Sequence, residues 1–140
     1  MKEPTTCVMI ADGARAKFLT KNTNALLPIL PTQHAEDTVT THLEHKHPSH
    51  GRVGIKALHS YYEHADWYYF KKEAFAIEIA RVLYNLVKTY DRLILIAAPV
   101  VLGCLRQHLS PHVASKITLE IDKDLTKIPL KKVMGYIQLP

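Results

Sequence analysis

The fold is decided by the stretch LILIAA, residues 93–98, which ends at Pro99. Six consecutive apolar residues closed by a proline are typical of a β-strand whose two faces are both covered, because a strand with one face in water alternates apolar and polar side chains. Strands of this kind belong to sheets on which helices are packed. LILIAA therefore predicts a central strand of an α/β domain.

Helical patterns flank this strand on both sides. Apolar residues recur with a helical period over residues 61–89, with no helix breaker, which predicts one long helix lying across a sheet. After the strand, residues 100–109 and 113–116 favour short helical segments, ITLEI (117–121) a second strand, and residues 129–137 a terminal helix with proline at its start. This order implies a parallel or mixed sheet with helices packed on it.

The N-terminal part of the chain predicts a β-hairpin. The apolar run TCVMIA (6–11) is followed by Asp12 and Gly13, a tight-turn pair, and then by an alternating stretch over residues 15–20. Residues 26–30, which are followed by a proline, favour a third strand at the edge of the sheet.

The pattern dissolves from about residue 31 to residue 60, in a segment rich in His, Thr, Pro and Gly. We expect a long loop there, and loops of this length inside a small domain are usually functional. Residues 1–140 are expected to form a single domain. The predicted fold class is α/β: a mixed β-sheet with helices packed on it, an N-terminal β-hairpin and one long helix.

Composition limits the classes of protein to consider. The 140 residues are 47% hydrophobic, include two cysteines and hold no apolar run of the ~18 residues that a membrane span needs. We therefore expect a soluble domain without disulfides and, since no secretory leader is visible, a cytoplasmic location. The formal charge is +5, and the whole excess lies in residues 71–140, which favours anionic partners such as RNA.

Histidines form the most conspicuous cluster, in the pattern H-x2-H-x-H-x2-H. Neutral imidazoles at this spacing can ligate Zn, Ni or Cu, so His42, His45 and His47 are candidate metal ligands. The alternative is a solvated polar loop that gains positive charge as the pH falls toward about 6. Because no cysteine accompanies the histidines, the electrostatic interpretation is favoured.

Carboxylates that follow the predicted strands suggest a second candidate site. Asp12 follows the first strand, and Asp122 and Asp124 follow ITLEI, so the three could converge on the two cations of a nuclease. Each of them also has an ordinary place in a turn. The chain has no G-x-S-x-G elbow, no P-loop and no G-x-G-x-x-G turn, so neither nucleotide-dependent chemistry nor a cofactor is expected.

Three stretches resemble the bacterial host-attachment family: VMIADGARA (8–16), DRLILIAAP (91–99) and EIDKDLT (120–126). Their order and spacing fit over nearly the whole chain, although Val100 stands where family members often carry arginine. The family in turn resembles the central domain of eukaryotic and archaeal peptide-chain release factors and of the rescue factor Pelota. The resemblance implies a release-factor central-domain-like, ribonuclease H-like architecture.

The predicted loop carries the residues that bear on activity. Release factors hold His-Gly-Arg-Gly-Gly-Gln in this loop, and the present chain reads HGRVGI over residues 50–55. Ile55 replaces the glutamine that helps to place a water against the peptidyl ester, and its side chain offers no hydrogen-bonding group. The resemblance therefore implies the scaffold without peptidyl-tRNA hydrolysis, and an enzyme is not the favoured interpretation.

The leading hypothesis is a non-catalytic, translation-associated module that contacts the ribosome or structured RNA through residues 41–59. The cationic loop side chains would bind phosphates, and the glycines would give the loop freedom. The candidate nucleic-acid-binding residues are His50, Gly51, Arg52, Gly54, Lys56 and Lys46. Two alternatives stay open: a factor required for attachment to host cells, acting directly or indirectly, and a metal-dependent nucleic-acid hydrolase that uses Asp122 and Asp124.

Overall fold

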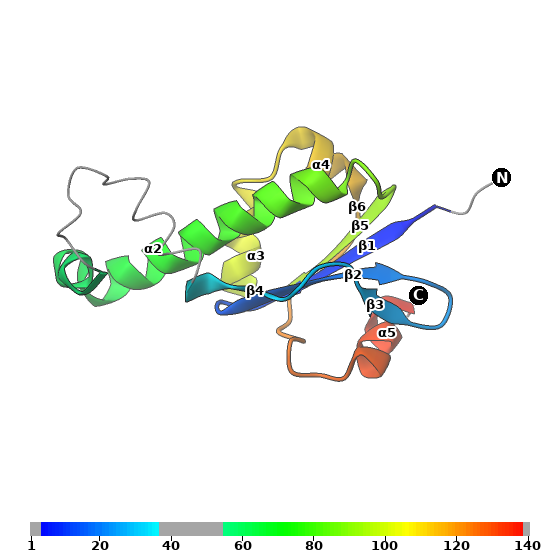
Figure 1. The fold of residues 1–140 in the computed structure, drawn as a ribbon, viewed down its shortest axis with the longest axis horizontal. Coiled ribbons are helices and arrows are strands. Elements are labelled where there is room, and N and C mark those ends of the chain that lie inside the picture. The colour runs from blue at the N-terminus through cyan, green and yellow to red at the C-terminus, as the bar shows by residue number, and fades with distance from the viewer. Residues whose placement is uncertain (1–3, 37–54, 139–140) are drawn as a thin grey trace.

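The computed structural model describes residues 4–36 and 55–138, with side chains described for residues 4–36 and 71–137. These residues form one mixed sheet of six strands together with four helices (Figure 1). The strands are β1 (Thr6–Ala11), β2 (Arg15–Lys21), β3 (Leu26–Pro28), β4 (Gln33–His34), β5 (Arg92–Ala97) and β6 (Ile117–Ile121). The helices are α2 (Ile55–Leu86), α3 (Pro99–Arg106), α4 (Pro111–Lys116) and α5 (Leu130–Gln138).

The sheet runs in the order β3-β2-β1-β5-β6, and the two-residue strand β4 pairs with β2. Strands β1, β5 and β6 are parallel, while β2 is antiparallel to β1. The LILIAA strand, β5, therefore has a neighbour on each side. Leu93 and Leu95 belong to the core on one face of the sheet, Ile94 and Ile96 to the core on the other, and none of the four is more than 5% exposed. The α/β fold and the covered central strand are confirmed.

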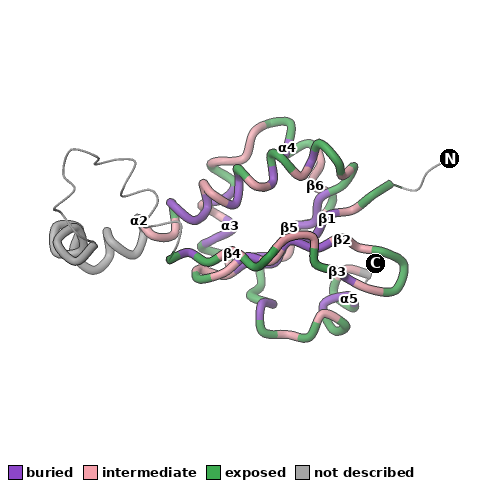
Figure 2. The backbone as a smooth tube through the Cα atoms, in the orientation of Figure 1, coloured by how far each residue is buried: buried purple, intermediate pink, exposed green. Residues whose placement is uncertain are grey.

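Helices cover both faces of this sheet (Figure 1). Helices α2, α3 and α4 lie on one face, where Phe75 and Leu105 belong to the same buried cluster as Leu95. Helix α5 covers the opposite face, where Val133 belongs to the same buried cluster as Ile96. The burial map places the buried residues along the inner strands and the inward sides of the helices (Figure 2). The domain therefore has three layers, and both crossovers between parallel strands run over the same face.

Prolines and a serine set where the short helices begin. Pro99 and Pro111 stand in the first turns of α3 and α4, where a missing amide hydrogen costs no helical hydrogen bond. The Ser110 hydroxyl accepts a hydrogen bond from the amide of Val113 at 3.2 Å and so caps α4. Helix α3 starts directly after β5, so the chain turns back over the sheet without a long loop.

The structure differs from the sequence-based expectation between residues 31 and 60. Strand β4 lies in the segment expected to be irregular, and α2 begins at Ile55 rather than at residue 61. Lys56, assigned to the loop on sequence, is therefore a residue of α2. The helical period was hidden because polar residues such as His59 and Ser60 interrupt the apolar stripe at the start of the helix.

Candidate functional site

Three parallel strands end at the same edge of the sheet. Ala11 of β1 pairs with Ala97 of β5, and Ile96 of β5 pairs with Ile121 of β6. Ligands of open α/β sheets bind beyond the carboxyl ends of such strands. The three carboxylates singled out from the sequence all follow these strand ends, so this edge is the natural place for a site.

Asp12 closes the turn between β1 and β2. Its Oδ1 accepts hydrogen bonds from the backbone amides of Ala14 at 2.7 Å and Arg15 at 2.8 Å, and its own amide donates to the carbonyl of Arg15 at 2.9 Å. This is an Asx-turn, in which the aspartate carboxylate accepts the hydrogen bond from the amide two residues further on. The second oxygen, Oδ2, faces the loop between β6 and α5, where it lies 2.9 Å from the Thr126 hydroxyl.

Thr126 lies between two carboxylates. Its hydroxyl is 2.9 Å from Oδ2 of Asp12 and 2.6 Å from Oδ1 of Asp124, and its backbone amide donates to the same Asp124 oxygen at 3.0 Å. Thr126 is only 3% exposed. A hydroxyl has one proton, so it donates to one of the two carboxylates at a time. Asp12, Asp124 and Thr126 form a unit that we term the hairpin–loop cluster.

Cations surround the hairpin–loop cluster. Arg15 Nε lies 4.0 Å from Oδ2 of Asp12, and Lys17 Nζ donates to the carbonyl oxygen of Thr126 at 3.0 Å. From α2, the Lys72 ammonium packs over the turn: a Cβ at Gly13 would lie 2.6 Å from its Nζ. Glycine at this position therefore makes room for a positive charge beside the cluster.

Asp12 is ionised at neutral pH. Burial by itself raises the pKa of Asp12, but the hydrogen bonds from the Ala14 and Arg15 amides and the Thr126 hydroxyl, together with the charge of Arg15, outweigh burial. The pKa of Asp12 therefore lies below its ordinary value of 3.8. Its Oδ1 accepts two backbone hydrogen bonds, and its Oδ2 shares the Thr126 hydroxyl with Asp124, which is the arrangement of a structural carboxylate more than of one held ready for a metal or a substrate.

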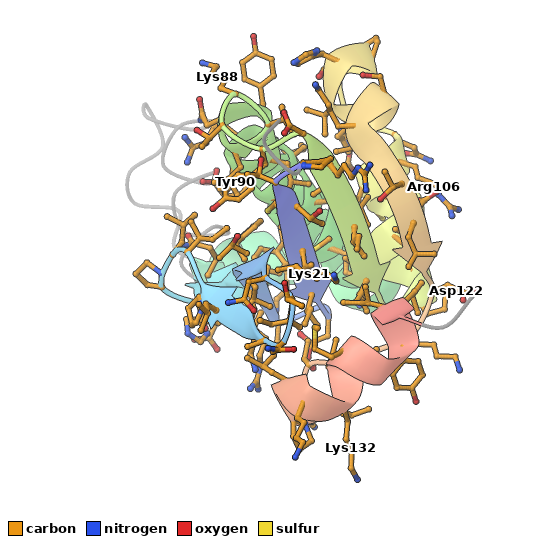
Figure 3. The ribbon with its side chains drawn as sticks, turned by 90° about the vertical axis from the view of Figure 1, so that its right-hand side faces the viewer. Lys21, Lys88, Tyr90, Arg106, Asp122 and Lys132 are labelled. Atoms are coloured by element: carbon orange, nitrogen blue, oxygen red, sulfur yellow. The ribbon has the colours of Figure 1, made fainter. Side chains whose placement is uncertain are left out.

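The predicted carboxylate site is thus formed in part. Asp12 and Asp124 come together through the hydroxyl of Thr126, whereas Asp122 is exposed at the end of β6 and makes no hydrogen bond or ion pair with either in the described part of the chain (Figure 3). Among the residues that the structure describes, no group of three or more His, Cys, Asp or Glu side chains is placed to hold a metal ion.

The structure does not describe the side chains of the metal-binding and nucleic-acid-binding candidates in the histidine-rich segment. For Lys56 and Ile55 the structure describes only the backbone, in the first turn of α2. The others lie outside the described residues, and their roles stay predictions: His42, His45, Lys46, His47, His50, Gly51, Arg52 and Gly54.

Two residues of the site, Thr126 and Lys17, were not predicted from the sequence. Thr126 follows Asp124 by two residues, a spacing at which an aspartate commonly accepts hydrogen bonds from the residue two positions on, so a local signal did exist. Lys17 carried no such signal. Its ammonium contacts the carbonyl of Thr126, which lies 109 residues further along the chain, so the contact depends on the assembled fold.

The three-layer α/β architecture and the closed hairpin turn define a small domain in which polar groups tie two distant segments together. Residues 7–137 match the family described as protein required for attachment to host cells, and the chain belongs to that family. No curated protein matches the chain significantly. The matched region includes the hairpin–loop cluster and nearly all of α5. The relation to the release-factor central domain stays a prediction.

One further property bears on how the protein meets its surroundings. Within residues 4–36 and 55–138, no helix combines the length and the apolar character needed to cross a membrane.

Proposed function

We propose that this protein is required for attachment to host cells and that it acts by binding a partner, not by catalysis. The match of residues 7–137 to the host-attachment family carries the proposal. Support for a binding role comes from the hairpin–loop cluster. Asp12 is its best candidate for a catalytic carboxylate, but hydrogen-bond donors of the chain itself already contact its oxygens. The partner is then recognised by the outer surface of the domain, not by a reactive group.

Attachment is tested by deleting the gene and counting bacteria that adhere to host cells. Deletion is expected to reduce adherence, and the wild-type gene supplied in trans is expected to restore it. A matched control supplies Leu95→Asp, which places a charge at a fully buried position of β5 and should fail to restore adherence because the fold is lost. Unchanged adherence in the deletion strain would overturn the proposal.

Whether attachment is direct or indirect is a separate question with a separate measurement. Protease treatment of intact cells removes surface-exposed protein and spares protein inside. In a direct role the protein is degraded by this treatment, and the purified domain competes with whole bacteria for host cells. In an indirect role the protein survives, and the deletion changes the abundance of other surface factors.

A translation-associated module is the second candidate function. Its support is the sequence HGRVGI at residues 50–55, which resembles the release-factor loop without the glutamine, together with the net charge of +5. Ribosome pelleting at low and moderate salt tests it. Arg52→Ala should weaken co-sedimentation, whereas Arg92→Ala, at an exposed arginine on β5, serves as the matched control. Absence of co-sedimentation at low salt would defeat this candidate.

A further inference from the structure

Helix α5 has an outer face of unusual composition. Val133 and Met134 are buried against the sheet, and the residues on the opposite side of the helix all lie in solvent. Residues three and four positions apart lie on the same side of a helix. The exposed residues are Lys131, Lys132, Gly135 and Tyr136. We term them the outer face of α5.

The outer face of α5 is positively charged near the helix N-terminus, where negatively charged side chains are the favourable ones. Residues 125–138 contain three lysines and no acidic residue. Two of them, Lys131 and Lys132, stand in the first turn of α5, and Lys127 lies just before it. The partial charge at a helix N-terminus is positive, so cations there are unfavourable and anions are favourable. In the described part of the chain none of the three lysines forms an ion pair, which leaves their charge to a partner.

Gly135 has no role inside the chain that requires glycine. It lies in the interior of α5, and a Cβ built there would meet no atom of the described residues within 4 Å. Alanine is a far better helix former at such a position. The missing side chain does, however, let another molecule's backbone approach the helix closely, between Lys131 and Tyr136 on the same side.

Tyr136 completes the outer face. Its side chain is 37% exposed, and the ammonium of Lys123, from the loop before α5, lies 5.3 Å from the centre of its ring. Lys132 stands one helical turn before Tyr136 and projects away from the sheet (Figure 3). An exposed aromatic ring among lysines is the arrangement on which unpaired bases stack while their phosphates are neutralised.

We infer that the outer face of α5 is an interaction surface for single-stranded nucleic acid. Lys127, Lys131 and Lys132 face the phosphates, Tyr136 stacks on a base, and Gly135 lets the strand lie close to the helix. This function goes beyond attachment and does not depend on it. A lipid surface fits less well, because the apolar side chains of α5 are directed to the sheet and leave no aliphatic anchor on the outer face.

The test is fluorescence anisotropy of the full-length protein with labelled oligouridine and with oligothymidine of the same length, at low and moderate salt. The double variant Lys131→Ala/Lys132→Ala should lower the slope of log affinity against log salt by about 1.4, because each phosphate contact on a single strand contributes about 0.7. Tyr136→Ala should weaken binding about fivefold or more, and Tyr136→Phe, which keeps the ring, should not.

The chain offers a matched control on the opposite face of the sheet. Near the end of α2, Lys88 lies 5.2 Å from the ring of Tyr84, which is 49% exposed, so the same pair of residue types occurs there without the lysine-rich helix start. The double variant Tyr84→Ala/Lys88→Ala should bind like the wild type. Circular dichroism establishes that each variant is folded.

Three outcomes would overturn the inference. They are no binding to either oligonucleotide at low salt, equal loss in the α2 and α5 variants, and α5-dependent binding to phosphatidylserine vesicles in place of oligonucleotides. None of these outcomes involves host cells, so a failed attachment experiment and a failed anisotropy experiment remain distinguishable.

Discussion

Replacing Thr126 by valine removes the hydroxyl that lies between Asp12 and Asp124 and keeps the shape of the side chain. In the wild type this hydroxyl is 2.9 Å from one carboxylate and 2.6 Å from the other, at a position that is 3% exposed. The substitution leaves the other hydrogen bonds of the hairpin–loop cluster in place. Asp12 keeps its two amide donors, and Asp124 keeps the amide of residue 126.

The magnitude follows from counting protons. A hydrogen bond to a charged group contributes about 1.5–3 kcal/mol, and the single hydroxyl proton can make only one such bond at a time. Asp124 is exposed, so water replaces the lost donor there at little cost. We therefore expect Thr126→Val to lower the free energy of unfolding by about 1.5 kcal/mol, near the lower end of that range and not twice it. In urea, with a slope of about 1.5 kcal/mol/M, the midpoint falls by roughly 1 M.

The effect should depend on pH in a defined direction. The pKa of Asp12 is depressed in the folded protein, so the ionised carboxylate contributes stability that is fully present above the ordinary value of 3.8 and is lost as the pH falls through the lower folded value. The Thr126 hydroxyl is one cause of that depression. The difference between wild type and Thr126→Val is therefore expected to shrink as the pH falls below 3.8.

Urea denaturation at neutral and acidic pH measures both quantities, and Thr126→Ser provides the control. Serine loses a buried methyl group, which costs about 1 kcal/mol at every pH, but it keeps the hydroxyl and with it the pH dependence of the wild type. The reasoning is refuted if Thr126→Val unfolds within about 0.5 kcal/mol of the wild type at neutral pH, the range of ordinary surface substitutions, or if its deficit is the same at every pH.

Three other outcomes follow from the fold. Leu95→Ala opens a cavity in a fully buried position of β5 and should cost about 2–5 kcal/mol in urea denaturation; a loss below about 1 kcal/mol would contradict a central strand. Gly135→Ala should raise the free energy of unfolding by about 1 kcal/mol, because the added methyl group meets no neighbour, and a decrease would contradict the open space found there. Burial raises the pKa of the Cys7 thiol to about 12, so mass spectrometry after brief iodoacetamide treatment should find Cys104 modified first; equal modification of the native protein would contradict the buried position of Cys7.

Local composition was sufficient to predict the inner strands. LILIAA has no polar residue to place in water, so it had to lie between two covered faces, and β5 does. Strand β4 could not be predicted in this way. Its two residues, Gln33 and His34, have no strand pattern of their own and are extended because they pair with Ala16 and Arg15 of β2. Such pairing is a property of the assembled sheet and not of the segment.

The candidate site shows the same division. Strand order places the ends of β1 and β6 at one edge, and from this the approach of Asp12 and Asp124 could be predicted. Asp122 was expected beside them, but the loop turns at Asp124, whose carboxylate accepts from the amide and the hydroxyl of Thr126. The turn determines which carboxylate reaches Thr126, and the sequence alone does not show that Thr126 lies between Asp12 and Asp124.

The hairpin–loop cluster also determines where the outer face of α5 lies. Thr126 is held by Asp12 and by Lys17 of the N-terminal hairpin, and Lys127 follows it directly in the chain. The buried Leu125 and the hydrogen bond from the Ile128 amide to its carbonyl oxygen at 3.2 Å then fix the turn that leads into α5. A substitution in the hairpin can therefore displace the lysines of α5 without touching them. If the outer face of α5 binds nucleic acid, Lys17→Met should weaken that binding, although the Lys17 ammonium contacts Thr126 and not the nucleic acid. If Lys17→Met lowered the stability of the protein and left binding unchanged, the hairpin would not position the lysines of α5.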